Sequence, residues 1–519
     1  MKNTRSRNNP YRYTQQFDLP FSFEQLYSYP EILKTKDYVS GKSSQRIGII
    51  GGGIAGLCSA YELNKLGHKV TVLEASHRLG GRIQTHYFSD GTHSELGAMR
   101  IPLSHRCVVH YLEEFQLPKQ PFVSYNPACF YYLRGQKTRL KEFGKLGQVY
   151  NLNINEERDP GWIYDEVLKT LVESLSEAEK WEMFSPTFSS DKLKEYDRTT
   201  FTQYFRDRLS PDAFELVGHA TGMIHYDRVS LLGGLIDFFA WYHAEQYQLI
   251  GGMETLVKAF VERLSGKIQG DAKVTAIQMT DTGVRVNWDR LDSAQVQEFD
   301  YLICTIPTPA LAKIEFNPVL PADKMQAIRS LGYSSAAKTL FHCKARPWEL
   351  HDNIYGGGSF TDLPMEKCWY PSDNACFAGE EAGNPRWVAQ DPEISHQPTG
   401  FTAAYRWESN ARHFLRLEER ERTDSTLQEI QQLHPQIEEY VDEVVHCLWD
   451  EESNPGSGAY AFFAPGEHER MQGLLCQPYP LDKPRVFFAG EHLAIDHASV
   501  QGAIQTAVSA VIDILQILT

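Results

Sequence analysis

Apolar runs and helical spacings alternate along the chain after its first 45 residues. A short apolar run over Arg46–Ile50 predicts a buried strand, and apolar residues at helical intervals continue beyond it to Leu66. Gly67 ends the helical pattern, and a second apolar run, Lys69–Leu73, predicts another strand. Strand, helix and strand in this order predict a βαβ unit with parallel strands.

Later segments are predicted in the same way. Residues 141–249 have apolar positions at helical intervals amid dense charge and are predicted to be mostly helical, for example at 165–175 and 177–183. Residues 1–44 are polar and aromatic, helix-like at 24–29, and are expected to wrap against the body. The remaining predictions are a helix at 254–264, strands at 273–279, 283–288 and 301–306, and an amphipathic helix within 503–519 that packs on the nucleotide-binding part.

The glycine-rich turn of the βαβ unit carries the first candidate chemistry. Gly51, Gly53 and Gly56 fit the spacing G-x-G-x-x-G between the predicted strand and helix. Glycines here allow a tight turn and a close approach of backbone N–H groups to a pyrophosphate, and Glu74 after the second strand offers a carboxylate to a ribose hydroxyl. A turn that only allows close packing is the alternative for the isolated motif. The full context predicts dinucleotide binding.

Composition indicates a globular, acidic protein. The 519 residues allow two or three domains, and 42% hydrophobic residues are typical of packed cores. A net charge of −16 disfavours nucleic acid as a partner. No apolar stretch suits a membrane span and no apolar core follows the N-terminus, so a cytoplasmic protein without membrane contact is expected. The nine cysteines are expected to be reduced, and His492 and His497 to be structural, which leaves no metal site.

Three further motifs carry a family resemblance. They are Arg78-Leu-Gly-Gly-Arg82, Ser94-Glu-Leu-Gly-Ala-Met-Arg-Ile-Pro102 and Val486-Phe-Phe-Ala-Gly-Glu491. With the glycine-rich turn, they resemble the flavin amine oxidase family, and most closely its FAD-dependent L-amino acid oxidases, over the chain from about Arg46 to the C-terminus. NAD enzymes lack the Arg-x-Gly-Gly-Arg element and the terminal Gly-Glu, so the resemblance implies FAD as the cofactor.

The resemblance also implies a fold and a set of cofactor contacts. The expected fold is α/β, with an FAD-binding, doubly wound (Rossmann-like) domain, an inserted mixed-sheet substrate domain and a helical subdomain. The expected boundaries are 45–104, 248–311 and 447–519 for the FAD-binding domain, 1–44, 105–140 and 312–446 for the substrate-binding domain, and 141–247 for the helical subdomain. The expected FAD contacts are Gly51, Gly53, Ile54, Ala55, Gly56, Glu74, Ala75, Arg78, Gly81, Arg82, Gly97, Ala98, Met99, Arg100, Val274, Gly490, Glu491 and Val500. For Val274 alone, an ordinary strand valine is the alternative.

Two positions concern the flavin ring. Lys338 has apolar neighbours and matches the lysine that family members hold near flavin N5 through a water, where a cation stabilises charge on the reduced flavin and helps dioxygen react. A solvated lysine is the alternative, which the apolar neighbours disfavour. In monoamine oxidases a cysteine within Ser-Gly-Gly-Cys-Tyr bonds the flavin. The comparable stretch is 456–460, with Ala459 in place of the cysteine, so the resemblance implies non-covalent FAD.

The segment that contains Arg100 resembles the part of L-amino acid oxidases whose arginine grips the substrate carboxylate. A guanidinium forks bidentately onto a carboxylate. An arginine that pairs with Glu95 or with a phosphate is the alternative. Tyr370, before a proline, resembles the tyrosine that hydrogen-bonds the same carboxylate, and Trp369 beside it is expected to line the site. Either aromatic in the core is the alternative.

The chain departs from the family after its terminal Gly-Glu motif. Many L-amino acid oxidases carry His-Gly-Trp-Ile there, with the tryptophan as a wall of the substrate site and the glycine carbonyl as acceptor for the amine. Here Ser499 replaces the aromatic residue, which leaves Tyr460 as the wall and favours a longer or more polar substrate side chain. The carbonyl of Ala498 is still expected to accept from the amine.

The predicted function is therefore oxidative deamination of an L-amino acid to a 2-oxo acid, ammonia and hydrogen peroxide. Acids around the helical segment, Asp227, Asp237 and Glu245, favour a basic side chain such as arginine or lysine, with a bulky aromatic one next, although acids on helices are usually just solvated. A polyamine or monoamine oxidase and an amino acid 2-monooxygenase, which forms an amide with loss of CO2, stay open. A non-enzymatic flavin-binding scaffold would leave the site residues idle. The resemblance suggests a homo-oligomer, a dimer or higher.

Overall fold

We analysed a computed structural model of the chain, which describes residues 44–242, 245–291, 293–450 and 458–518. The predicted wrapping segment 1–44 therefore lies outside the described residues except for its last one, and so do the first two residues of the stretch 456–460.

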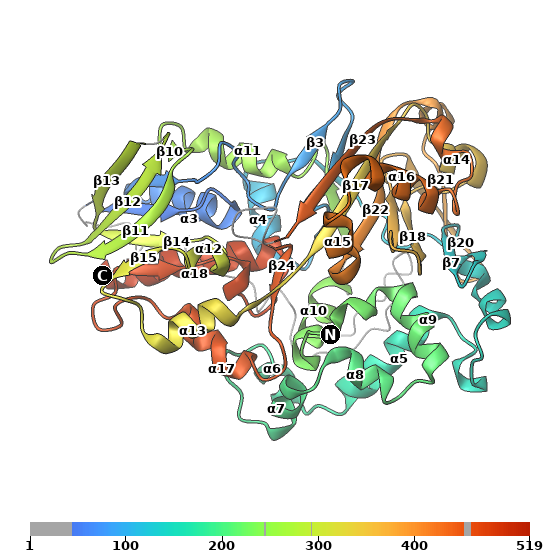
Figure 1. The fold of residues 1–519 in the computed structure, drawn as a ribbon, viewed down its shortest axis with the longest axis horizontal. Helices are drawn as coiled ribbons and strands as arrows, with labels where there is room; N and C mark the ends of the chain where they lie inside the picture. Colours follow the sequence, from blue (N-terminus) through green and yellow to red (C-terminus); the bar gives the residue numbers. More distant parts are fainter. Residues whose placement is uncertain (1–43, 243–244, 292, 451–457, 519) are drawn as a thin grey trace.

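A parallel five-stranded sheet forms the nucleotide-binding part (Figure 1). Its strand order is β10 (Ile268–Gln269), β2 (Lys69–Leu73), β1 (Arg46–Ile50), β14 (Tyr301–Cys304) and β25 (Val486–Phe488). The β1 residues after Arg46 are all buried, as expected for a strand with both faces covered. The predicted βαβ unit is confirmed, with helix α3 (Ile54–Lys65) between β1 and β2. The strands come from three separated stretches of chain, so the cofactor side of the sheet is assembled from distant sequence.

Different layers cover the two faces of this sheet. One face packs against α3, α4 (Arg106–Glu114), α11 (Glu254–Arg263) and α18 (Val500–Leu518) in one apolar core. On the other face lie α12 (Thr308–Leu311), α13 (Ala322–Ser330), α17 (His468–Cys476) and an antiparallel layer of β13 (Ser293–Phe299), β12 (Val284–Arg290) and β11 (Lys273–Met279), with β15 (Glu315–Asn317) parallel at its edge. Strand β13 was not predicted, because all but one of its residues are partly or fully exposed and it lacks an apolar run.

Helix α18 confirms the predicted C-terminal amphipathic helix. Its length and hydropathy would suit a membrane span, but 61% of its most apolar window is buried inside the protein. Ala503, Ile504, Ala507 and Val508 pack with α3 residues in the core. The helix is therefore a core element of the nucleotide-binding part.

A seven-stranded sheet forms the second part of the molecule. Its order is β23 (Val441–Trp449), β17 (Ala336–Cys343), β22 (Thr399–Trp407), β19 (Lys367–Tyr370), β18 (Gly357–Thr361), β7 (Phe130–Leu133) and β8 (Gln136–Arg139). The short pair β16 (Gly332–Ser334) and β24 (Tyr460–Phe462) adjoins it in sequence, and α14 (Pro347–Asp352), α15 (Glu408–Leu415) and α16 (Glu419–Ile430) accompany the sheet. Side chains alternate between the two faces, so neighbouring residues on one strand reach different surroundings.

A helical insertion follows the seven-stranded sheet's first hairpin in sequence and lies below that sheet in Figure 1. It contains α5 (Pro160–Glu173), α6 (Glu177–Glu182), α7 (Asp191–Arg198), α8 (Phe201–Arg206), α9 (Pro211–Thr221) and α10 (Leu231–Tyr242) around an aromatic-rich core. This confirms a mostly helical segment at 141–249, except that its last residues form strand β9 (Gln246–Leu249) with β5 (Ile101–Pro102) and β6 (Lys119–Pro121). Two further pairs are β3 (Thr85–Tyr87) with β4 (His93–Glu95) and β20 (Ala375–Glu381) with β21 (Asn384–Ala389).

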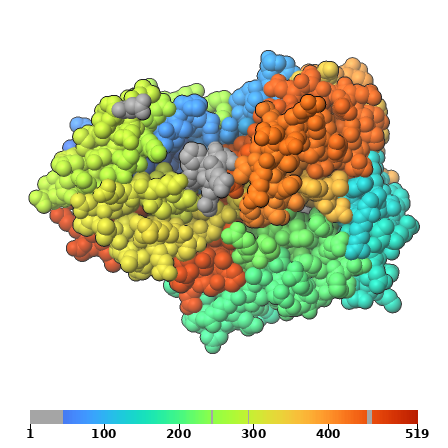
Figure 2. All heavy atoms as spheres, viewed as in Figure 1, coloured from blue at the N-terminus to red at the C-terminus, as the bar shows by residue number. Residues whose placement is uncertain are grey.

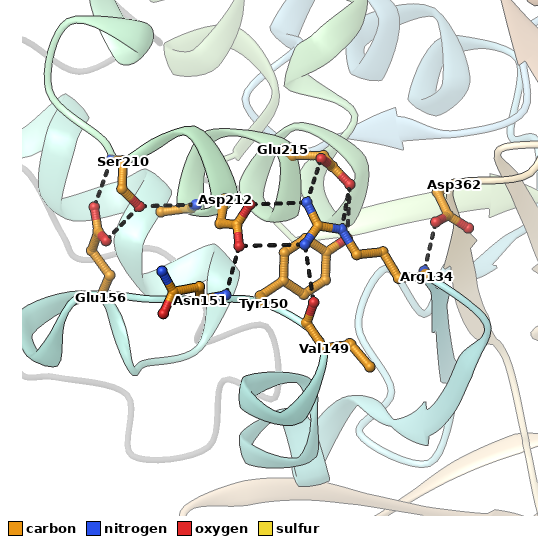
Figure 3. Close-up of polar contacts among 10 residues, drawn as sticks. Arg134, Val149, Tyr150, Asn151, Glu156, Ser210, Asp212, Glu215 and Asp362 are labelled. Atoms are coloured by element: carbon orange, nitrogen blue, oxygen red, sulfur yellow. Dashed lines mark hydrogen bonds and ion pairs between the residues drawn. The ribbon is translucent and has the colours of Figure 1, made fainter.

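Arg134 joins the sheet to the helical insertion (Figure 3). It stands in the tight turn between β7 and β8 with φ of +48°, followed by Gly135 with φ of +75°, the backbone of a hairpin turn. Its guanidinium donates to Asp212 and Glu215 at the start of α9 and lies 4.1 Å from the ring centroid of Tyr150. Figure 2 shows the resulting surface, with the antiparallel layer and α13 at one end and the seven-stranded sheet and helical insertion at the other.

Candidate functional site

The glycine-rich turn leaves the N-terminus of α3 open to a ligand. Gly51 has a φ of +107°, and a Cβ on Gly56 would lie 1.9 Å from the carbonyl oxygen of Gly51, so the turn requires glycine at both positions. Gly53 precedes the helix without a side-chain cap, and the first turn has no acidic residue, although Ile54 and Ala55 bring apolar packing. Uncapped N–H groups and the positive end of the helix dipole suit a phosphate.

Glu74 ends the first βαβ unit beside this turn. Its carboxylate accepts from the backbone N–H groups of Gly52 at 2.7 Å and Ser76 at 2.9 Å, which fixes the side chain at the carboxyl edge of the sheet. Ala75 follows it, and the backbone oxygen of Glu74 accepts from Ala272 at 2.8 Å. That bond brings the start of β11, where Val274 lies buried, next to the predicted ribose contact.

The loop after Glu74 supports the turn from the other side. Gly80 pairs with Gly53 in a parallel bridge, and Gly81 lies 3.9 Å from the position of a Cβ on Gly53. The Arg78 guanidinium donates to carbonyl oxygens of its own loop, at Leu79, Gly81 and Ile83, so the structure uses it to hold the loop.

Glu491 gathers distant segments around a buried ion pair. It follows Gly490, whose φ is +135°, and accepts from Arg82 at 2.6 Å. It also accepts from the backbone N–H groups of Ala461 at 3.2 Å and Ala498 at 3.0 Å. Burial opposes ionisation, but Arg82, the two nearby histidines and the N–H of Ala498 together lower the pKa of Glu491 to about 2. One carboxylate thus joins Arg82, 409 residues away in the sequence, to two nearby C-terminal segments.

Lys338 lies against the segment from Glu95 to Met99. It points from β17 into the protein with 1% exposure, and its ammonium donates to the carbonyl oxygens of Gly97 at 2.7 Å and Glu95 at 3.1 Å. Gly97 must be glycine, because a Cβ would lie 2.0 Å from the Arg82 carbonyl oxygen. Ala98 packs against the core of the nucleotide-binding part. The predicted burial of Lys338 is confirmed.

Burial sets the ionisation of Lys338 and its neighbour Glu95. Burial lowers the pKa of Lys338 below its ordinary 10.5, against the attraction of Glu95. Burial also raises the pKa of Glu95, whose carboxylate accepts from the N–H of Met253 at 2.7 Å and the hydroxyl of Thr85 at 3.0 Å. Burial therefore favours the neutral form of each group, and their mutual attraction favours the charged forms.

Arg100 lies within a ring of aromatic side chains. The guanidinium carbon is 5.0 Å from the ring centroid of Trp369 and 5.6 Å from those of Phe122 and Trp241. Three elements therefore meet around it: β19 supplies Trp369, the segment after β6 supplies Phe122, and α10 supplies Trp241. Aromatic faces attract a guanidinium while leaving its N–H edge for a planar acceptor. Trp369, which was predicted to line the substrate site, therefore lies beside Arg100.

Tyr370 does not join Arg100, which corrects the prediction that it holds the same carboxylate. It follows Trp369 on β19 and points to the opposite face of the sheet, where its ring stacks on Phe401 at 5.5 Å. Its hydroxyl hydrogen-bonds Ser359 and His434, both at 2.8 Å. With 2% exposure, Tyr370 is a core residue. The motif identified a tyrosine before proline, but strand alternation decides which aromatic faces the site.

The start of α18 contains the residues that differ from the family pattern. Ala498 has a φ of +64°, a left-handed conformation that suits the glycine found there in the family, and Glu491 holds its N–H. The Ser499 hydroxyl accepts from the N–H of Gly502 at 2.8 Å and so caps α18. The Ser499 hydroxyl, which led to the expectation of a more polar substrate side chain, is therefore already hydrogen-bonded within the helix. Val500 begins the helix and packs against the core.

Several site residues carry no motif and were missed. Tyr405 and Trp407 of β22 face Lys338 and Tyr460: the Tyr405 ring centroid is 4.6 Å from the ammonium of Lys338, and Trp407 meets Tyr460 edge-on at 5.5 Å. Their positions depend on a bulge in β22 opposite Thr339 and Leu340, which shifts the alternation. Tyr460, the predicted aromatic wall, thus lies beside Trp407.

Two charged residues also belong to this site: Asp237, which the sequence named, and Lys367, which it missed. Asp237 of α10 accepts from the Tyr226 hydroxyl, and burial raises its pKa to about 6 despite the nearby Arg100. Lys367 of β19 places its ammonium 5.9 Å from the ring centroid of Tyr405 and 6.0 Å from that of Trp407. The one signal for Lys367 in the sequence is its position two residues before Trp369, because residues two apart on a strand face the same side of the sheet.

The residues at the carboxyl edge of the parallel sheet fit FAD. Gly53 has space where a Cβ would stand, Gly51, Gly56 and Gly97 have none to spare, and the start of α3 keeps its N–H groups without a side-chain cap. Glu74 lies beside the start of β11, which contains Val274, and Lys338 binds the segment that leads to Arg100. A glycine-rich turn at an open helix N-terminus, with an acid after the second strand, suits the phosphates and ribose of a dinucleotide.

The chain matches known proteins along most of its length. A family model described as flavin containing amine oxidoreductase matches residues 54–515. An L-amino-acid oxidase of Vipera ammodytes ammodytes is 29% identical over 478 residues, which cover 90% of this chain and 92% of that protein. A putative L-amino-acid oxidase of Bacillus subtilis is 30% identical over 478 residues, 89% of this chain and 92% of that protein.

A solved structure agrees with the fold. Putrescine oxidase bound to putrescine superposes with a TM-score of 0.71 at 19% sequence identity, over 91% of this chain and 99% of that structure. At this identity, the likeness concerns the fold alone.

Proposed function

The chain belongs to the flavin-containing amine oxidoreductases, and on that premise we propose that it oxidatively deaminates L-amino acids. The family match confirms the predicted family, fold class and FAD cofactor, and makes the protein a flavin-dependent oxidoreductase that acts on amino groups. The proposed reaction converts an L-amino acid, water and dioxygen into a 2-oxo acid, ammonia and hydrogen peroxide. The length of the match to two L-amino-acid oxidases supports this choice.

Arg100 is the observation that carries the proposal. Its guanidinium stands among Phe122, Trp241 and Trp369, one residue from the cofactor segment that Lys338 binds. The planar guanidinium of Arg100 could donate two parallel N–H bonds to an α-carboxylate, which an amine substrate lacks. Arg100 would thereby fix the orientation of Cα relative to the cofactor.

The other residues position the amine and manage charge. When bound, FAD supplies the two-electron acceptor and the route for those electrons to dioxygen. The carbonyl of Ala498, turned by its left-handed backbone, would accept from the neutral amine, while Trp407 and Tyr460 enclose it. Lys338 would hold a positive charge at the carbonyl oxygens of Glu95 and Gly97, where it stabilises developing negative charge. Ala459, whose side chain cannot bond a flavin, supports non-covalent binding.

A substrate panel tests the proposal together with Arg100. Hydrogen peroxide release and oxygen uptake should be measured on the holoenzyme with the twenty L-amino acids, with putrescine and with benzylamine. In Arg100→Ala, kcat/KM for L-amino acids should fall roughly 10²- to 10⁴-fold, because two charge-assisted hydrogen bonds are lost, while FAD absorbance is retained. Arg100→Lys should recover only part of the loss. Unchanged kcat/KM for amino acids in Arg100→Ala would overturn the carboxylate assignment.

Two other activities are outcomes of the same panel. The fold shared with putrescine oxidase supports an amine oxidase as the second candidate, and faster oxidation of putrescine than of any amino acid would favour it. Amide product without equivalent hydrogen peroxide would identify an amino acid 2-monooxygenase.

The charge of the preferred side chain depends on fewer residues than the sequence suggested. Of the three acids that favoured a basic substrate, Asp227 is exposed and Glu245 accepts from the hydroxyl of Tyr247 at 3.0 Å, which leaves Asp237 at the site. We therefore propose that the preferred substrate has a long polar side chain.

A further inference from the structure

Lys367 faces the candidate substrate site from the middle of the seven-stranded sheet. Alternation along β19 places it on the same face as Trp369, whose ring contacts Arg100, and opposite to Cys368 and Tyr370 of the core. Its ammonium lies at the outer limit of contact with the rings of Tyr405 and Trp407. Lys367 therefore belongs to the same aromatic set as Arg100, Lys338 and Tyr460.

No acid of the described residues forms an ion pair with this ammonium, and none of their oxygen atoms lies within hydrogen-bonding distance of it. Glu366 is the nearest source of negative charge, but its carboxylate accepts from the N–H of Trp407 at 3.0 Å and from Asn410 at 2.8 Å and pairs with His225 at 2.7 Å. Burial lowers the pKa of Lys367 to about 8. A cation in such surroundings is costly unless a ligand neutralises it.

The end of α9 offers only partial compensation. A Cβ on Gly222, which ends that helix with a φ of +80°, would lie 3.0 Å from the Lys367 ammonium. The C-terminus of a helix attracts a cation only weakly. In the part of the chain that the structure describes, no helix-end carbonyl accepts a hydrogen bond from Lys367, so the attraction replaces neither a counter-ion nor an acceptor.

The charges at the site leave one negative group to be supplied. The Lys338 ammonium donates to two carbonyl oxygens, and the α-carboxylate of the substrate is assigned to Arg100. Asp237 is an acid close to these cations, and its carboxylate already accepts a hydrogen bond from the Tyr226 hydroxyl. After an α-carboxylate binds Arg100, Lys367 is the cation that a second carboxylate would neutralise.

We propose that Lys367 binds a carboxylate in the substrate side chain, so that the preferred substrates are L-amino acids with an acidic side chain. This inference rests on the proposed L-amino acid oxidase function and replaces the basic side chain that the sequence favoured. Trp369, on the same strand face as Lys367, contacts Arg100, and the positive charge of Arg100 lowers the pKa of Lys367. Both cations therefore face the same site, where the two carboxylates of one substrate would meet them.

Matched acid and amide substrates test the inference in the holoenzyme. We would compare kcat/KM for L-glutamate with L-glutamine and for L-aspartate with L-asparagine, alongside L-lysine and L-leucine. The wild type should prefer the acid over its amide at least tenfold. In Lys367→Met this ratio should collapse to about one, mainly through KM, and Lys367→Arg should restore most of it. Inhibition by glutarate, which needs no turnover, should weaken by a similar factor in Lys367→Met.

Lys137→Met is the matched control. Lys137 belongs to β8 of the same sheet, covers the ring of Phe130 at 4.1 Å and donates to the carbonyl oxygen of Leu433, so its loss should leave the acid-to-amide ratio unchanged. Equal losses for acid and amide in Lys367→Met, or a wild type that prefers lysine or leucine, would overturn the inference while the oxidase function stands. Oxidation of amines but of no L-amino acid would instead overturn the proposed function itself.

Discussion

The two ends of helix α9 each meet a cation from the seven-stranded sheet, and the described residues neutralise only one of them. At the N-terminal end, the Arg134 guanidinium pairs with Asp212 at 3.0 Å and Glu215 at 2.7 Å (Figure 3). At the C-terminal end, the Lys367 ammonium stands beside Gly222 without a carboxylate of the described residues in ion-pairing distance.

The difference separates a structural cation from a cation held for a ligand. Arg134 stacks on Tyr150 and joins sheet to helix, so its partners are part of the fold. Lys367 shares its surroundings with Arg100 and the aromatic residues of the substrate side. Buried or half-buried charges are retained when something neutralises them, and at Lys367 that partner is not built into the described chain.

Lys338 is a third buried cation, and its substitution should have the largest effect on activity. Its hydrogen-bond partners are backbone carbonyls, so no hydrogen-bonded carboxylate cancels the charge that its ammonium carries beside the cofactor segment. In Lys338→Met, kcat/KM for dioxygen should fall roughly 10²- to 10³-fold, as when one preorganised electrostatic group is removed. Stopped-flow reoxidation of the reduced holoenzyme measures it.

The role of Lys338 also predicts the direction in which kcat/KM for dioxygen changes with pH. Because the folded pKa of Lys338 lies below 10.5, the wild-type kcat/KM for dioxygen should be highest at low pH and fall as pH rises through that pKa, and the variant should lack this limb. Lys324→Met is the control, since Lys324 is also buried and donates to three backbone carbonyls, away from this site. A similar loss in both variants would make the effect structural.

The sequence predicts those features of the fold and site that depend on neighbouring residues, and it fails for those that depend on contacts between distant segments. The βαβ unit and the open start of α3 follow from local periodicity and glycine positions. Trp369 and Tyr370 differ by one residue, and only pairing in the sheet decides which of them faces the site. The bulge that turns Tyr405 and Trp407 toward Lys338 and the seating of Asp237 on α10 come from non-local packing, which no motif in the chain encodes.

Arg134→Ala should be the largest change in stability among these variants. It removes two ion pairs and the stacking on Tyr150, although the side chain is 31% exposed and solvent screens the charges. The free energy of unfolding should fall by about 1–2 kcal/mol, measured by urea denaturation of the holoenzyme. The acid-to-amide ratio should not change. A shift of that ratio would mean that the two ends of α9 act together.

Lys367→Met should do the opposite and leave stability unchanged or slightly higher near pH 7. The folded pKa of Lys367 is about 8 and its ordinary value is 10.5, so the unfolded chain binds more protons between these values and the wild type gains stability as pH rises through them. The advantage of the variant over the wild type should therefore shrink by about 1 kcal/mol from pH 7 to pH 10, after allowing for solvent at the ammonium. A variant clearly less stable at pH 7 would indicate that the protein does neutralise Lys367.

Ala498→Gly should have the smallest effect. It tests whether the backbone strain at Ala498 is less well compensated than the strain at Arg134. Arg134 and Ala498 both adopt positive φ, but ion pairs compensate the first, whereas a single bond from the Ala498 N–H to Glu491 holds the second. Glycine removes a left-handed penalty of about 1–2 kcal/mol and adds flexibility to the unfolded chain, so stability should rise by about 0.5–1 kcal/mol. If the Ala498 carbonyl holds the amine, kcat/KM should stay within about twofold, because the carbonyl keeps its direction. A large loss of activity with unchanged stability would show that the methyl group itself contacts the substrate.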